Sequence, residues 1–231
     1  MICKRRLLWW ETTLEDVKKD KKVLEPIGVA LKELHAKTNV NFDLLHRLIS
    51  YQLFDLERSE MQSMNDLTNY GENTRSLTFY CYLHILGIND PNAYSAASHM
   101  GMCYGMIDVL RKMQYYLINN RQYLPSDLLL KHGIYFDKIY NPRTEALVEE
   151  EFFDVILEIA AHAKKHLEKA RSYKDLLPKH SHRALLFGIE AENYLKDLEN
   201  YNFDIFEDHF KQISYAKVPF KILRAAKKQL Y

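Results

Sequence analysis

Apolar residues recur every three to four positions along nearly the whole chain, the spacing that places them on one face of an α-helix. The chain has only 7 glycines and 6 prolines, so turn residues are scarce, which favours long helices over many short strands. The clearest single pattern is that of a long amphipathic helix with Phe152, Ile156, Ile159, Ala163, Leu167 and Ala170 on one face. We therefore expect an all-α fold of about eight to ten helices, with residues 1–231 forming a single domain.

Local start and stop signals divide this pattern into helices. Ser63 and Asp66 resemble a capping box, and Asp90 followed by Pro91 is typical of a helix start. Gly133 and Pro178 are expected to end helices. The predicted helices cover residues 6–20, 23–36, 44–53, 63–87, 91 onward, 126–133, 152–170, 185–198 and about 209–228.

The composition excludes several classes of protein. There are 32 Lys and Arg against 31 Asp and Glu, a net charge of +1, so no bulk field favours nucleic acid as a partner. No run approaches the ~18 continuous apolar residues of a membrane span. Cys3, Cys81 and Cys103 show no paired spacing, which argues against a disulfide framework or zinc cluster and favours a reducing compartment. We expect Cys81 and Cys103 to be packing residues inside helices.

Three pairs of side chains have spacings that could suggest a metal site. His162 and His166 share a helix face, but Lys164 and Lys165 lie between them, so we interpret that face as solvated. Asp16 and Asp20 lie in a run of mixed charge, and His180 and His182 flank a predicted loop. No metal ion or cofactor is expected at any of these pairs.

Residues 108–125, "DVLRKMQYYLINNRQYLP", carry the strongest motif. They resemble the segment "N-I-L-R-D-V-x-E-D" followed by "G-R-x-Y-L-P" in the squalene/phytoene synthase family, with the spacing kept. The similarity extends upstream through "DLTNYGENTRSLTFYCYLHILGI" and "AASHMG", and downstream through "AKKHLEKARSYKDLLP" and "YNFDIF". It covers the chain from about Arg6 onward. The order and spacing of these segments are more specific than any one of them.

The resemblance implies an isoprenoid synthase-type helical bundle, in which two acidic helices hold magnesium ions that stabilise a departing diphosphate. The family's first metal-binding helix would precede Met1, so we expect this chain to lack the N-terminal helices of the bundle. In the second metal-binding helix, a lysine cation and a phenol are poor replacements for magnesium ligands. The candidate remnant of the diphosphate site comprises Asp108, Arg111, Lys112, Tyr115, Tyr116 and Arg121, with Lys112, Tyr115 and Tyr116 at positions where the family has acids.

The same comparison predicts a narrowed cavity. Arg75, Ser76 and Phe79 fall where the family keeps small side chains, and bulkier residues there would fill the space that a prenyl chain occupies. We therefore interpret the chain as a non-catalytic pseudoenzyme. Two alternatives stay open: an active magnesium-dependent prenyl transferase of the squalene or phytoene synthase type, and a non-catalytic protein that binds a prenyl lipid or quinone.

The elements "YGENT", "AASH" and "FDIF", together with the missing acids, resemble a non-catalytic subgroup of this family that acts in the assembly of mitochondrial respiratory complex I. The resemblance implies a peripheral protein on the matrix side of the inner membrane. Its partners would be complex I assembly intermediates or other assembly factors. The start "MICKRRLLWWETT" shows no clear presequence, so a cytosolic form also stays open.

The C-terminal segment predicts a basic amphipathic helix. Lys217, Lys221, Arg224 and Lys228 form one stripe, and Val218, Ile222, Ala225 and Ala226 fall on the other side. The stripe could contact anionic inner-membrane lipid peripherally. We favour a closing helix whose apolar side packs on the core, because Pro219 shortens the helix and we find no large aromatic anchor opposite the stripe.

Overall fold

The computed structural model describes residues 2–38, 40–139, 150–211, 217–228 and 231. These residues form helices joined by short turns, and their only extended pairing is one isolated bridge between Glu60 and Gln122. The all-α prediction is therefore confirmed. The α-helices are α1 (Ile2–Lys18), α2 (Pro26–Lys37), α3 (Phe42–Glu57), α4 (Met64–Gly71), α5 (Leu77–Ile85), α6 (Pro91–Arg111), α7 (Met113–Ile118), α8 (Ser126–Lys131), α9 (Phe136–Ile139), α10 (Glu150–Ser172), α11 (Phe187–Asn200), α12 (Asp208–Lys211) and α13 (Lys217–Lys228).

The described residues contain more helices than the eight to ten that we expected, because several predicted helices are interrupted. The predicted helix 63–87 comprises α4, a π-helical turn over Glu72–Ser76 and α5. A single non-helical residue, Lys112, separates α6 from α7. After α10, the chain forms two short 3₁₀ turns, Lys174–Leu176 and Ser181–Leu185, on either side of Pro178. The predicted C-terminal helix begins later than expected, at Lys217, with the short α12 before it.

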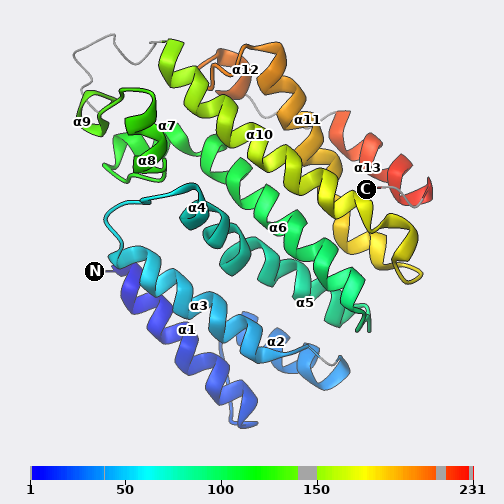
Figure 1. Ribbon diagram of the computed structural model, residues 1–231. Helices are drawn as coiled ribbons and strands as arrows, with labels where there is room; N and C mark the ends of the chain where they lie inside the picture. Colours follow the sequence, from blue (N-terminus) through cyan, green and yellow to red (C-terminus); the bar gives the residue numbers. More distant parts are fainter. Residues whose placement is uncertain (1, 39, 140–149, 212–216, 229–230) are drawn as a thin grey trace.

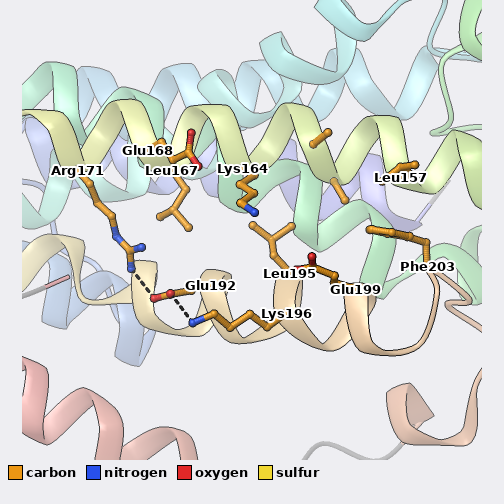
Figure 2. A pocket seen from close by; sticks show the side chains of 12 residues that line it. Leu157, Lys164, Leu167, Glu168, Arg171, Glu192, Leu195, Lys196, Glu199 and Phe203 are labelled. Atoms are coloured by element: carbon orange, nitrogen blue, oxygen red, sulfur yellow. Dashed lines mark hydrogen bonds and ion pairs between the residues drawn. The ribbon is translucent and has the colours of Figure 1, made fainter.

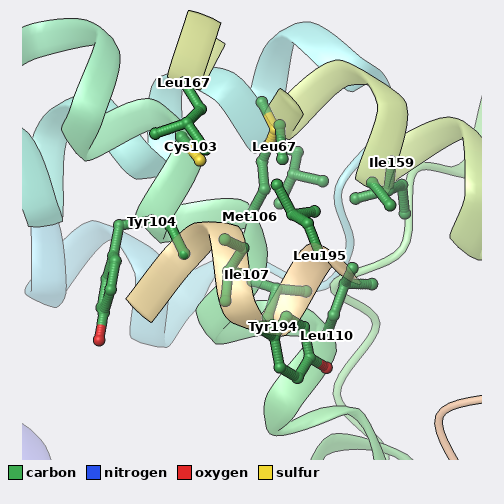
Figure 3. Packing of buried hydrophobic residues seen from close by; sticks show 14 of the residues in the cluster. Leu67, Cys103, Tyr104, Met106, Ile107, Leu110, Ile159, Leu167, Tyr194 and Leu195 are labelled. Carbon is green, nitrogen blue, oxygen red and sulfur yellow. The ribbon is translucent and has the colours of Figure 1, made fainter. Parts of the chain in front are cut away.

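The central helix of the bundle is α6, which Figure 1 shows between α10 on one side and α4 and α5 on the other. Its residues are buried around most of its circumference, and Figure 3 shows Met106, Ile107 and Leu110 packed among side chains of the neighbouring helices. Leucine, isoleucine and methionine side chains buried in this way supply most of the hydrophobic stabilisation of such a bundle. The sequence pattern of α10 is confirmed, since every residue of its predicted apolar face is buried.

Glycine allows α6 to approach the π-helical turn and α4 closely. A Cβ atom on Gly101 would lie 2.1 Å from Ser76 Oγ, and one on Gly105 would lie 2.4 Å from Gly71 Cα. Neither contact is compatible with any side chain, so the backbones cross at a distance that only glycine permits. The crossing fixes the turn that contains Arg75 against the C-terminal half of α6.

Helices α1, α2 and α3 form a layer next to α4 and α5 (Figure 1). This layer has a small apolar cluster of its own, formed by Leu14, Val17, Val40 and Phe42. That residues 1–231 fold as a single domain stays a prediction. Among the described helices, none is both long enough and apolar enough to cross a membrane.

Candidate functional site

A cleft of about 400 Å³ lies where α3, the α4–α5 region and the α6–α7 junction meet. It contains several of the residues that the motif singled out, together with residues that the sequence did not suggest. Its polar lining consists mainly of cationic, acidic and phenolic side chains, namely Asp55, Tyr70, Arg75, Lys112, Tyr116, Arg121 and Tyr123.

Asp108, at the edge of this cleft, is shared by two cations. Its side chain is buried, with only 7% of the residue exposed. Its Oδ2 atom forms an ion pair with Nη2 of Arg75 and lies 3.8 Å from Nζ of Lys112, one helical turn further along. Arg75 also lies over the ring of Tyr104. The carboxylate oxygen that could serve a divalent metal ion is therefore already in contact with positive charge.

A second buried carboxylate, Asp55 on α3, has the same type of environment. The residue is 5% exposed and forms an ion pair with Arg58. Arg121 donates a hydrogen bond to its backbone oxygen at 2.8 Å and lies 3.7 Å from its Oδ2 atom. The hydroxyl of Tyr123 donates a hydrogen bond to that same Oδ2 atom. Because these contacts surround the carboxylate, they compensate the cost of burying its charge.

Sequence reasoning missed Asp55, although Arg121 and Tyr123 belong to the quoted motif. Asp55 lies 66 residues before Arg121 and outside every motif segment. The only local signal is the i, i+3 spacing of Asp55 and Arg58, a spacing that is common on solvated helices. The sequence does not show that this pair is buried.

Tyr116, which stands at a position where the family has an acid, lines the cleft. Its ring stacks on Tyr123 with a centroid distance of 4.1 Å, and burial raises the pKa of its phenol above the ordinary value. Burial likewise raises the pKa of Tyr70 and Tyr123. These phenols are therefore neutral at physiological pH and offer a divalent cation no anionic oxygen.

Arg111 and Tyr115 do not line the cleft. Arg111 forms an ion pair with Glu190 at 2.8 Å, and its guanidinium lies 4.7 Å from the ring centre of Tyr194. It therefore connects α6 to α11. Tyr115 is exposed on α7. Of the six predicted residues, the structure brings Lys112, Tyr116 and Arg121 together in the cleft, with Asp108 in contact with Lys112.

The interpretation of His162 and His166 as a solvated face was wrong. Both rings are half-buried, and Nδ1 of His166 lies 3.0 Å from Nδ1 of His99 on α6. The partner could not be found from the sequence, because 67 residues separate His99 from His166. Burial lowers the pKa of His166 to about 4, with the two neighbouring histidines adding to the effect. Among the described residues, no three His, Cys, Asp or Glu side chains form a group that could hold a metal ion.

The remaining candidate residues, namely the aspartates, cysteines and histidines with suggestive spacing, take part in ion pairs, packing or turns. Asp16 and Asp20 form ion pairs with Lys21 and Lys32, in agreement with a solvated face. Cys103 is buried as expected and Cys81 is half-buried. His182 does not flank a loop as predicted but lies buried in the second 3₁₀ turn, and the left-handed φ of His180 precedes that turn.

A second hollow, also of about 400 Å³, lies between α10 and α11 (Figure 2). Leu167 and Leu195 contribute to its apolar floor. The rim is closed at one end by Glu192, which forms ion pairs with Arg171 at 2.8 Å and Lys196 at 2.6 Å. The carboxylate of Glu192 is therefore already paired within the chain.

The predicted C-terminal helix is present as α13, and its side facing the bundle contains Ala225, which is buried, with Ile222 and Ala226 half-buried. That the apolar side packs on the core is therefore confirmed. Lys221 and Arg224 of the predicted stripe are exposed, whereas the side chains of Lys217 and Lys228 lie outside the described residues. Phe220 is exposed beside the stripe and does not lie opposite it, so it does not contradict the expectation that no large aromatic anchor lies opposite the stripe.

Comparison with known proteins adds three observations. The family model of squalene/phytoene synthase matches residues 2–220. Two relatives, each named "NADH dehydrogenase (ubiquinone) complex I, assembly factor 6", are 31% identical (Mus musculus) and 30% identical (Homo sapiens) over 207 residues. The alignment covers 90% of this chain but only 61% of each relative, so the chain spans about three fifths of their length.

Two solved structures have the same fold. Squalene synthase HpnC from Alicyclobacillus acidocaldarius superposes with a TM-score of 0.75 at 18% identity, covering 85% of this chain and 73% of that one. A dehydrosqualene synthase in complex with ligand gives a TM-score of 0.78 at 15% identity, with coverages of 96% and 77%. At these identities the likeness shows the isoprenoid synthase-type fold and nothing about chemistry.

Proposed function

Because this chain belongs to the squalene/phytoene synthase family, we propose that it is a non-catalytic member that acts in the assembly of mitochondrial respiratory complex I. The relatives named for complex I assembly support this proposal. Since the chain spans 61% of their length, the roles of the whole relatives are part of what we propose. In this proposal the synthase fold provides surfaces for contact with other proteins and does not catalyse a reaction.

The observation that carries the non-catalytic part is the ion pairing in the cleft. Enzymes that ionise a prenyl diphosphate need metal ions, held by carboxylates, to stabilise the leaving group. Here Arg75 and Lys112 contact the carboxylate of Asp108, and Arg58 and Arg121 contact that of Asp55. A divalent cation would have to displace one of these side chains and would meet like charge at close range. Lys112 and Tyr116 offer it no anionic ligand.

A turnover assay tests this part directly. The purified protein would be incubated with farnesyl or geranylgeranyl diphosphate and Mg²⁺, with an active squalene synthase as a positive control. We expect no pyrophosphate release above the protein-free rate. Magnesium-dependent release that disappears in Arg121→Ala would contradict the proposal and favour an active prenyl transferase.

The assembly part predicts a peripheral protein at the matrix side of the inner membrane, in contact with complex I assembly intermediates or other assembly factors. Cells that lack the protein should contain less assembled complex I, whereas the other respiratory complexes stay near normal levels. Native-gel profiles of their mitochondria measure this, and re-expression of the wild-type chain is the control. Normal complex I in the deletion strain would rule out the assembly role without bearing on the turnover result.

A further inference from the structure

The outward face of α13, which lies beside α11 at the C-terminal side of the bundle (Figure 1), carries two large apolar side chains in water. Phe220 is 75% exposed and Leu223 is 60% exposed, whereas Ala225 on the inward side is 6% exposed. At three residues' separation, Phe220 and Leu223 are neighbours on the helix surface. Single exposed apolar residues are common on soluble proteins, but two adjacent ones on one short helix call for an explanation.

The charges around this apolar pair all have one sign. Lys221, Arg224 and Lys227 are exposed, and α13 contains no acidic residue. Among the described residues, none of the three has a carboxylate within ion-pair distance, and Lys221 makes its hydrogen bond to the side-chain oxygen of Asn193 at 2.5 Å. The face therefore presents positive charge outward without an internal counter-charge.

The spacing links each apolar side chain to a cation. Arg224 lies four residues after Phe220, and Lys227 lies four residues after Leu223, so each cation stands one turn along the helix from an apolar neighbour. Lysine and arginine at such positions can extend to phosphate groups while the apolar side chains point deeper. Helix α13 packs against α11, and Ala225 and Ile222 on its inward side are buried and half-buried, so the bundle holds the outward face at a fixed orientation.

We propose that the outward face of α13 is a contact surface for an anionic lipid bilayer, with Phe220 and Leu223 inserted at the headgroup–acyl boundary and Lys221, Arg224 and Lys227 paired with lipid phosphates. Charge complementarity selects anionic lipid, and the apolar pair selects a bilayer over a soluble anion. An acidic protein surface would satisfy the cations but would leave the apolar pair without a matching environment. The inference is independent of the proposed role in complex I assembly.

Vesicle co-sedimentation of the full chain tests the proposal, using phosphatidylcholine vesicles with and without cardiolipin at low and high salt. We expect binding only when cardiolipin is present, with partial resistance to salt. Phe220→Ser/Leu223→Ser and Lys221→Gln/Arg224→Gln/Lys227→Gln should each weaken binding by about tenfold or more. The matched control is Leu24→Ser/Ile27→Ser, an exposed apolar pair near the start of α2, which should bind like the wild type.

Insertion can be separated from surface adsorption by placing a tryptophan at position 220. Phe220→Trp, in a Trp9→Phe/Trp10→Phe background, should show a blue-shifted emission on cardiolipin vesicles, and the shift should persist at high salt. Circular dichroism melting checks that every variant is folded. The proposal would be overturned if the wild-type protein did not bind cardiolipin vesicles at low salt. It would also be overturned if the Phe220→Ser/Leu223→Ser variant bound them as tightly as the wild type.

Discussion

The cleft and the outward face of α13 are both rich in basic residues, but they use their positive charge in opposite ways. Arg75 and Arg121 in the cleft, and Arg58 beside it, contact buried carboxylates of the same chain. On α13, Arg224 and Lys227 point to solvent and have no carboxylate partner among the described residues. The cations of the cleft are therefore part of the folded structure, and those of α13 are available to an external partner.

This difference has an energetic consequence. Removing one partner of a buried ion pair leaves an uncompensated charge away from water, which costs several kcal/mol. Removing an exposed charge changes the free energy of unfolding by a few tenths of a kcal/mol. Substitutions in the two regions should thus differ in their effect on stability even when they remove the same kind of side chain, and the four predictions below follow that order.

The largest effect is expected for Asp55→Ala. The substitution leaves Arg58 without its buried partner and removes the acceptor of Tyr123, so we expect a loss of about 3–5 kcal/mol in the free energy of unfolding. Chemical denaturation measures it. The control is Asp43→Ala, which breaks an exposed pair with Lys18 and should cost less than about 1 kcal/mol. Equal losses in the two variants would mean that burial of the carboxylate is not the deciding factor.

A smaller loss of stability is expected when either of the two cations that contact Asp108 is removed, and the loss should differ between them. Arg75 makes the closer ion pair, whereas Lys112 lies 3.8 Å away and is half-exposed. We therefore expect Arg75→Ala to cost about 1–3 kcal/mol and Lys112→Ala less than about 1 kcal/mol. Thermal and chemical unfolding of both variants gives the order. The reverse order would indicate that Lys112, and not Arg75, neutralises the carboxylate.

The histidine contact between α6 and α10 should make stability depend on pH. The folded-state pKa of His166 is about 4, below its ordinary value of 6.5, so the unfolded chain takes up a proton first. The contribution of His166 to stability should therefore be complete above about pH 7.5 and fall by roughly 1–2 kcal/mol as the pH decreases to about 5. Denaturation midpoints at pH 8, 7 and 5 measure the fall. His166→Asn should reduce the slope between pH 7 and 5, and an unchanged slope would assign the effect to other groups.

The smallest effect is expected on α13. Lys221→Gln/Arg224→Gln/Lys227→Gln should change the free energy of unfolding by less than about 0.5 kcal/mol, because these side chains are exposed and lack acidic partners. The same variant should lose affinity for anionic vesicles. A destabilisation comparable to that of Asp55→Ala would show that the cations of α13 hold the helix on the bundle, which would remove the contrast between the two regions.

The helical fold was predictable because it depends on local periodicity. The apolar face of α10 is read directly from Phe152, Ile156 and Ile159, which recur at helical spacing and are all buried. The π-helical turn at Glu72–Ser76 was not predictable, since it adds one residue to a turn without changing the kinds of residue. That turn nevertheless carries Arg75, the side chain that contacts Asp108.

Only those residues of the candidate site that belong to the sequence motif could be predicted. Lys112, Tyr116 and Arg121 lie close together in sequence, and the structure brings them into one cleft. Asp55 and His99 were missed because Arg121 and His166, the contacts that give them their role, lie more than 60 residues away, and a single sequence contains no record of such contacts. Phe220 was overlooked because helical periodicity alone does not show which edge of an amphipathic helix the bundle covers.

Magnesium-dependent binding of an unreactive prenyl diphosphate analogue tests most directly whether the internal ion pairs of the cleft replace a metal site. Isothermal titration calorimetry would compare the affinity of farnesyl thiodiphosphate for the wild-type chain with and without Mg²⁺. The ion pairs of Asp108 with Arg75 and Lys112 predict that Mg²⁺ does not increase the affinity. A large increase in affinity with Mg²⁺, lost in Arg121→Ala, would contradict the account and indicate a working diphosphate site.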